Sequence, residues 1–188
     1  AAGDALKQLQ QFIDAAERSD GDRQTDGWLF GHLGYDLKNE TESLSSSKPD
    51  HIGFPDVFFF EPACIIRLNR FEISIEAEDA SSVWQAIQQA TTEARYIKPR
   101  TQIQQRFTRE EYLSVIDQLK RHILRGDCYE INFCQEFFIE EAVIDPLFVY
   151  RQLSKVSPNP FSALYKTGDQ WLICASPERF IRKEGSRI

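Results

Sequence analysis

Hydrophobic residues recur every three or four positions in four segments of the chain, and this spacing predicts four amphipathic helices. The predicted helices span residues 4–16, 81–94, 108–125 and 146–153. Thr108 and Glu111 fit a capping box at the start of the third helix, and Gly126 follows at its C-terminal end. Asp145-Pro146 is a favourable start for the fourth helix.

Short apolar or alternating runs between these helices predict β-strands. The runs are 28–36, 57–60, 63–68, 71–75, 129–139, 161–165, 170–175 and 180–182. Gly31 and Gly34 interrupt the first run, which we expect to be a buried strand, so another backbone or a ligand comes close there or the strand bulges. Leu68–Phe71 and Thr167–Asp169 supply turns between consecutive strands. Because several strands follow one another without intervening helices, the pattern favours antiparallel pairing and the α+β class.

Residues 97–105 have no hydrophobic period and contain a proline, several glutamines and several basic residues. A stretch of this kind is typical of a linker. We therefore expect two parts, residues 1–100 and residues 106–188.

The composition is that of an ordinary globular protein, with 188 residues, 41% hydrophobic and 27% charged. A chain of this length is expected to bury about 70% of its unfolded surface without a disulfide or metal. The net charge is −7 and the basic residues are scattered among acids, which argues against binding to nucleic acid or to a membrane surface. No apolar run approaches the roughly 20 residues that span a bilayer.

Cysteine and histidine spacing argues against a structural metal site. The cysteines are Cys64, Cys128, Cys134 and Cys174, and none belongs to a C-x-x-C pair. Their apolar neighbours predict buried free thiols in a reducing, cytoplasmic setting. His32 and His122 have no recognisable partner and are predicted not to be ligands, and Asp127 is predicted to be structural.

Several short motifs stand in one order along the chain. They are Gly27–Leu37, Arg106–Tyr112, Gly126–Gln135, Pro158–Ala163 and Ala175–Phe180. The third resembles G-D-I-Y-Q-x-N-x-S-Q, the fourth N-P-x-P-F-x-A and the fifth S-S-P-E-R-F. In order and spacing they resemble component I of aminodeoxychorismate synthase (para-aminobenzoate synthase) and of anthranilate synthase, and the resemblance covers nearly the whole chain.

The resemblance implies an α+β fold of antiparallel sheets in a sandwich flanked by helices, of which this chain is an incomplete part. Residues 1–100 would be the N-terminal domain of component I, and residues 106–188 the beginning of its chorismate-binding domain. The family's P-I-K-G-T or P-I-A-G-T motif and its magnesium-binding glutamates would lie beyond Ile188. The chain would therefore be an internal fragment of a cytoplasmic synthase, inactive by itself and without a metal site of its own.

The reaction implied by the resemblance is the amination of chorismate to 4-amino-4-deoxychorismate in the folate and para-aminobenzoate pathway. The cofactor would be Mg²⁺, and a glutamine amidotransferase subunit would supply ammonia. In this branch a lysine of the P-I-K-G-T motif is expected to attack the ring first. Glu178 would be the general acid for the leaving hydroxyl, with low-polarity walls from Cys174-Ala175 and Phe180. The alternative is a surface carboxylate paired with Arg179 or Arg182.

By the same resemblance, Pro160, Phe161 and Ser162 would bind tryptophan. The alternative is that Phe161 is a core residue and that the prolines set a turn. Two other functions remain open for the chain. One is anthranilate synthase component I of the tryptophan pathway, and the other is a non-catalytic tryptophan-binding or subunit-docking domain.

Overall fold

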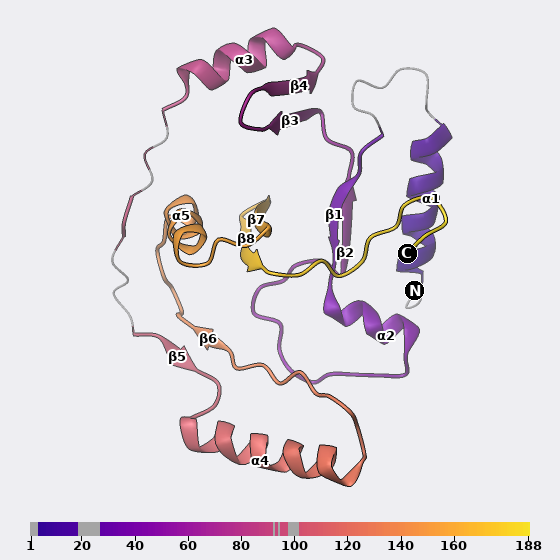
Figure 1. Ribbon diagram of the computed structural model, residues 1–188, viewed down its shortest axis with the longest axis vertical. Coiled ribbons are helices and arrows are strands. Elements are labelled where there is room, and N and C mark those ends of the chain that lie inside the picture. The colour runs from indigo at the N-terminus through magenta and orange to yellow at the C-terminus, as the bar shows by residue number, and fades with distance from the viewer. Residues whose placement is uncertain (1–3, 19–26, 92, 94, 98–101) are drawn as a thin grey trace. The chain divides into compact units, whose positions relative to one another are not determined.

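A computed structural model describes residues 4–18, 27–91, 93, 95–97 and 102–188. Contacts within the chain divide it into two compact units, residues 1–92 and 93–188, which Figure 1 shows in its indigo-to-magenta and pink-to-yellow parts. Residue 94, at the end of the second predicted helix, and residues 98–101, in the predicted linker, lie outside the described residues. The assignment of two family domains stays a prediction.

The described residues of unit 1 form three α-helices, one 3-10 turn and two antiparallel ladders. Its elements are α1 (Ala5–Arg18), β1 (Phe30–Leu33), η1 (Tyr35–Leu37), α2 (Lys38–Thr41), β2 (Val57–Phe60), β3 (Cys64–Leu68), β4 (Ile73–Ala77) and α3 (Ala80–Gln89). Strand β1 pairs with β2, and β3 pairs with β4. Asp79 caps α3 by accepting a hydrogen bond from the Ser82 backbone N–H at 2.9 Å, so this helix begins one residue before the predicted Ser81.

Gly31 explains the close pairing of β1 with β2. A Cβ atom at this position would lie 1.9 Å from the Phe58 backbone oxygen and 2.8 Å from Cα of Phe59. The prediction of a closely approaching backbone is therefore confirmed. The prediction of a long buried strand is wrong, because β1 has only four residues and three of them are exposed.

In unit 2, the residues that the structure describes form two α-helices and two further ladders. Its elements are β5 (Gln104–Gln105), α4 (Arg109–Arg125), β6 (Phe137–Phe138), α5 (Pro146–Val156), β7 (Phe161–Thr167) and β8 (Gln170–Ser176). The capping box between Thr108 and Glu111 is present, and Gly126 ends α4 with a φ of 87°. Asp145 caps α5, so these local predictions are confirmed.

Two predicted strands of unit 2 are wrong. In residues 129–139 only β6 is a strand. It pairs with β5, whose two residues were expected to end the linker. Residues 180–182 form no strand, although Glu184 makes an isolated antiparallel bridge with Arg187. An apolar run becomes a strand only when a second strand satisfies its backbone groups, and among the described residues only Phe137 and Phe138 of these two runs have such a partner.

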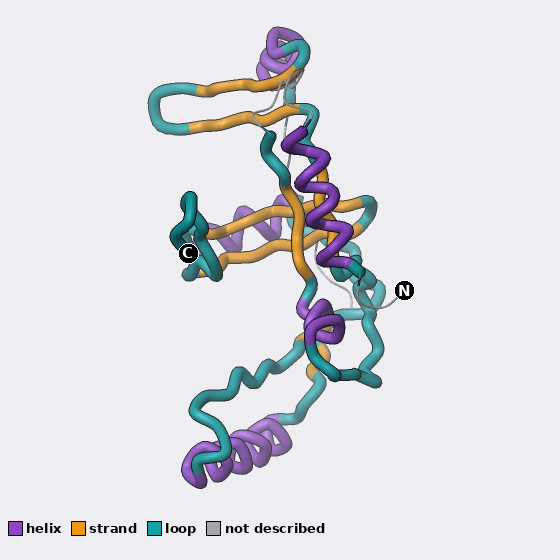
Figure 2. Tube along the Cα trace, turned by 90° about the vertical axis from the view of Figure 1, so that its right-hand side faces the viewer, coloured by secondary structure: helices purple, strands orange, loops and turns teal. Residues whose placement is uncertain are grey.

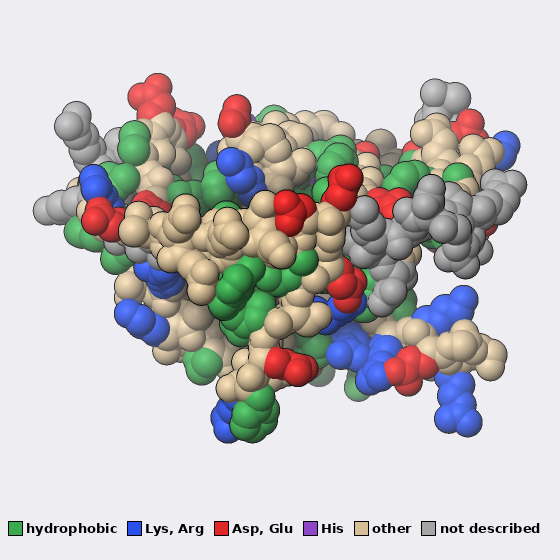
Figure 3. Space-filling view, turned by 90° about the horizontal axis from the view of Figure 1, so that it is seen from above, with side chains coloured by type: hydrophobic (Ala, Val, Ile, Leu, Met, Phe, Trp, Pro, Cys, Tyr) green, Lys and Arg blue, Asp and Glu red, His purple; other side chains and the backbone are tan. Residues whose placement is uncertain are grey.

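The described residues form very little core. Among them only Ala16 and Ile65 are buried, whereas Tyr129 and Phe180 are 94% and 97% exposed. Hydrophobic side chains accordingly reach the surface drawn in Figure 3, where they are green. The expectation of an extensive core is not met, and the four free cysteines are partly or fully exposed, so their predicted burial is also wrong. The α+β class with antiparallel pairing is confirmed, while the stacking of the ladders into a sandwich stays a prediction.

Candidate functional site

The hairpin of β7 and β8 brings the predicted site segments together. The two strands pair over seven positions, from Phe161 opposite Ser176 to Thr167 opposite Gln170, and Figure 2 draws them in orange. Gly168, with a φ of 54°, lies in the two-residue connection. Because Ser162 pairs with Ala175, the segments 158–162 and 175–179 meet at the open end of the hairpin, opposite the turn.

Helix α5 leads directly into this open end. The helix ends at Val156, and the Ser157 backbone N–H donates to the Leu153 carbonyl at 2.8 Å. Residues 158–160 then connect α5 to β7, and α5 also contacts both strands of the hairpin. Three elements are therefore joined around one short connection.

Asn159 lies at the centre of this connection. Its side-chain amide nitrogen donates to Ser157 Oγ at 2.7 Å and to the Ala175 carbonyl at 3.1 Å. Its own carbonyl accepts from Ser162 Oγ at 2.8 Å and from the Ser162 backbone N–H at 3.3 Å. No sequence motif assigned a role to this residue, although an asparagine between two prolines indicates a turn with a side-chain hydrogen bond.

The three residues expected to bind tryptophan have different surroundings. Pro160 is exposed, whereas Phe161 and Ser162 are half-buried. The guanidinium carbon of Arg179 lies 5.2 Å from the centre of the Phe161 ring, which is a cation–π distance. The Ser162 hydroxyl is used in the turn with Asn159. Phe161 is therefore not a buried core residue in the described chain.

Glu178 lies two residues beyond the end of β8 and is exposed. Its backbone carbonyl accepts a hydrogen bond from Ser176 Oγ at 3.0 Å, which closes a tight turn. Arg179 faces Phe161, and Arg182 forms an ion pair with Glu184. The low-polarity walls expected around Glu178 are not formed by the described residues, since Phe180 is almost fully exposed.

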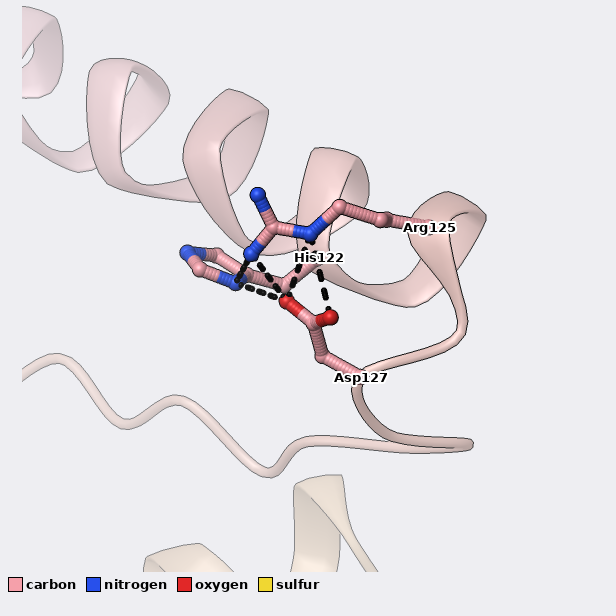
Figure 4. Close-up of polar contacts among 3 residues, drawn as sticks. All are labelled: His122, Arg125 and Asp127. Atoms are coloured by element: carbon pink, nitrogen blue, oxygen red, sulfur yellow. Dashed lines mark hydrogen bonds and ion pairs between the residues drawn. The ribbon is translucent and has the colours of Figure 1, made fainter.

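A second polar cluster closes the C-terminal end of α4 (Figure 4). His122 Nδ1 lies 2.7 Å from Asp127 Oδ2, and Arg125 Nε donates to both carboxylate oxygens of Asp127 at 3.0 Å. The Arg125 guanidinium, and then His122, lower the pKa of Asp127, and Asp127 raises the pKa of Arg125. The prediction that His122 has no partner is wrong. These bonds hold the turn at Gly126 against the last turn of α4, which agrees with the predicted structural role of Asp127.

A shallow open pocket of about 360 Å³ lies beside the start of α4. Its walls are Gln105, Phe107, Thr108, Arg109, Tyr112, Gln135 and Phe137. The Gln135 side-chain amide donates to the Phe107 carbonyl at 2.8 Å, while its oxygen is buried without a hydrogen-bond partner. The pocket contains none of the predicted site residues.

The described part of the chain offers neither a cluster of metal-binding side chains nor a helix that could span a membrane. No group of three or more histidine, cysteine, aspartate or glutamate side chains within it is arranged to hold a metal ion. None of its helices combines the length and the apolar character needed to cross a membrane.

Comparison with known proteins identifies the family. The family model of chorismate binding enzymes matches residues 2–188. Aminodeoxychorismate synthase component 1 of Escherichia coli is 30% identical over 98% of this chain and 42% of its own length. Anthranilate synthase component 1 of Thermus thermophilus is 27% identical over 86% of this chain and 38% of its own length. The chain therefore spans about two fifths of the length of these curated relatives.

A solved structure shows the same fold. The crystal structure of anthranilate synthase component I from Streptococcus pneumoniae matches 88% of this chain and 43% of its own, with a TM-score of 0.68 and 18% identity. At this identity the likeness shows the fold alone, while the family match rests on the sequence. The chain belongs to the family of chorismate binding enzymes.

Proposed function

We propose that this chain is the front part of component I of an aminodeoxychorismate synthase, which aminates chorismate to 4-amino-4-deoxychorismate. The observation that carries the proposal is the register of β7 and β8. It places Glu178 and the segment 160–162 at one end of one hairpin, within a chain that belongs to the chorismate binding enzymes.

The exposed apolar residues support the view that further polypeptide completes the site. The aromatic rings of Phe180 and Tyr129 are almost fully exposed, and the pocket beside α4 has aromatic walls and an unsatisfied Gln135 oxygen. In the full-length protein we expect the remaining three fifths of the relatives' length to cover these groups. The same polypeptide would surround Glu178 with the apolar groups that the described residues do not supply.

Glu178 would act as the general acid of the reaction. Hydroxide is a poor leaving group, so a carboxylic acid must protonate the ring hydroxyl as its C–O bond breaks. The turn closed by Ser176 holds the backbone of Glu178 in one position, which limits the paths open to its carboxyl.

We propose that three further parts of the reaction lie outside the described residues. They are the magnesium ligands, the lysine nucleophile and the amidotransferase that supplies ammonia. Those residues offer no group of three acidic, histidine or cysteine side chains that fits a metal ion. Pro160, Phe161 and Ser162 are proposed to bind tryptophan, with the Phe161 ring already stacked by Arg179.

The decisive experiment uses the full-length protein with chorismate, ammonia and Mg²⁺, and identifies the product by chromatography. We expect 4-amino-4-deoxychorismate from the wild type and no product from the 188-residue chain alone. Glu178→Gln should lower kcat by at least about 100-fold with little change in the KM for chorismate, because the variant cannot donate the proton.

Glu42→Gln is the matched control, since Glu42 has an exposed side chain far from the hairpin in sequence, and its kcat should stay unchanged. A full-length Glu178→Gln protein that turns over at the wild-type rate would refute the acid assignment. Turnover by the 188-residue chain would refute the proposal that the site needs further polypeptide.

Anthranilate synthase component I is the second candidate, because a relative of that name is 27% identical over 86% of the chain. Anthranilate as the product of the same assay would decide for it. A chain that only binds tryptophan would show saturable heat in calorimetry and no product in the full-length protein.

A further inference from the structure

We propose that Asn159 is a positioning residue that holds the backbone leading to Glu178, and this inference rests on the proposed function. The path from the Ala175 carbonyl to Glu178 passes only Ser176 and Pro177. Asn159 donates to that carbonyl at 3.1 Å, at the point where β8 has one residue left.

Both hydrogens of the Asn159 side-chain amide have acceptors in this arrangement. An amide nitrogen carries two hydrogens, and the two nearest acceptors are Ser157 Oγ at 2.7 Å and the Ala175 carbonyl at 3.1 Å. The first acceptor belongs to the end of α5 and the second to the end of β8. One amide group therefore ties the helix to the strand that leads to Glu178.

The backbone around Asn159 strengthens this tie. Pro158 and Pro160 have fixed φ angles on either side of it, which restricts the conformations open to the connection. The Asn159 carbonyl also accepts two hydrogen bonds from Ser162, the second residue of β7. The open end of the hairpin is thus closed by hydrogen bonds that a residue outside both strands makes, one from its side chain to Ala175 and two to its backbone carbonyl from Ser162.

Loss of the amide would leave the Ala175 carbonyl without this donor and would let the end of β8 move. Catalytic groups are sensitive to such movement, since a displacement of about 1 Å can cost about 100-fold in rate. A residue that acts through Glu178 has no effect on the rate once the Glu178 carboxyl is absent. This condition separates positioning from a general contribution to folding.

The test is a double-mutant cycle in the full-length protein with chorismate, ammonia and Mg²⁺. Asn159→Ala should lower kcat about tenfold and change the KM for chorismate by less than about twofold. The same substitution in the Glu178→Gln background should change the residual kcat by less than about twofold. Asn39→Ala, at an exposed position of α2, is the matched control and should leave kcat unchanged in both backgrounds.

Equal losses from Asn159→Ala in the two backgrounds would overturn the inference, because they would indicate a structural role. A normal kcat in Asn159→Ala would overturn it as well. If Asn159→Ala does not fold, Asn159→Asp keeps the shape of the side chain, removes the donor and is judged by the same cycle. A wild-type protein that does not convert chorismate would refute the proposed function, and the role of Asn159 with it. If the wild type is active but Asn159→Ala lowers kcat equally in both backgrounds, only the role of Asn159 is refuted.

Discussion

The ladder of β1 with β2 and the hairpin of β7 with β8 reach antiparallel pairing by different means. Strands β1 and β2 pair over four positions and are separated by the long connection of residues 34–56. Strands β7 and β8 pair over seven positions and are separated by two residues. The first ladder depends on one close backbone approach at Gly31, and the second on a local turn and on Asn159 at the open end.

The difference explains why the candidate site lies on the second ladder. Closing a long connection costs more chain entropy than closing a two-residue turn, so β1 and β2 need good contacts to stay paired. The aromatic rings of Phe30 and Phe60 supply one such contact at 6.2 Å. In the β7–β8 hairpin the turn already sets the register, and polar side chains remain available to shape the open end beside Glu178.

The largest effect is expected from Gly31→Ala, which should abolish the β1–β2 pairing. The new Cβ atom would overlap the backbone of Phe58 and Phe59, which cannot move without separating the strands. We expect a loss of about 3 kcal/mol or more in the free energy of unfolding, as in severe overpacking. In the full-length protein, hydrogen exchange of β1 and β2 measures the loss of pairing, and thermal unfolding measures the loss of stability.

Gly34→Ala is the matched control for this substitution. A Cβ atom at Gly34 would meet Asp56 at 3.1–3.4 Å, and the backbone φ of −74° suits any residue. The expected loss is below about 1 kcal/mol. Unchanged exchange protection of β1 in Gly31→Ala would mean that the close approach does not hold this ladder.

A smaller effect is expected from Gly168→Val, which strains the turn between β7 and β8. The φ of 54° is unfavourable for a β-branched residue, at a cost of about 1–2 kcal/mol, although nothing lies near its Cβ. Gly168→Asn should cost less because asparagine accepts this conformation more readily. Equal thermal stability of the valine and asparagine variants would show that the turn does not control the hairpin.

The smallest effect is expected when the pH is lowered, which should weaken local hydrogen-exchange protection. It can be compared at one carboxylate from each region. Asp50 lies in the connection between β1 and β2, and its pKa is lowered by hydrogen bonds from the backbone N–H groups of Gly53 and Ile52. Asp145 caps α5 beside the hairpin, and its pKa is lowered by the N–H groups of Arg95 and Phe148. Because the pKa of each carboxylate is lower in the folded state, its stabilisation of the fold is complete above the unfolded pKa of about 4. This stabilisation is lost as the pH falls through the pKa of the folded state.

Hydrogen exchange between about pH 5 and pH 2 tests this expectation, after correction for the intrinsic exchange rate. Acid should weaken protection at the start of α5 in the wild type, whereas Asp145→Asn should weaken it at neutral pH and remove part of the pH dependence there. Asp50→Asn should do the same only in the connection of residues 34–56. A wild-type pH profile of α5 that Asp145→Asn leaves unaltered would contradict the cap assignment.

The predicted helix ends and the predicted hairpin turn, which rest on neighbouring residues, agree with the structure. The Thr108–Glu111 capping box, the Gly126 terminus and the Asp145 cap each join groups within about four positions. The turn of the β7–β8 hairpin is equally local, and it is enough to bring Pro160–Ser162 and Glu178 to one place. For this reason the candidate site could be assembled from sequence motifs and one predicted hairpin.

The order of residues along the chain was thus enough to predict the helix ends, the turns, the α+β class and the family resemblance, since all of these depend on nearby residues. The three-dimensional structure was needed to establish that β5 pairs with β6, that residues 129–136 and 180–182 form no strand, and that Asn159 bonds to Ala175. Strand pairing and burial depend on partners distant in sequence. An apolar residue such as Phe180 therefore stays exposed where the described chain provides nothing to cover it.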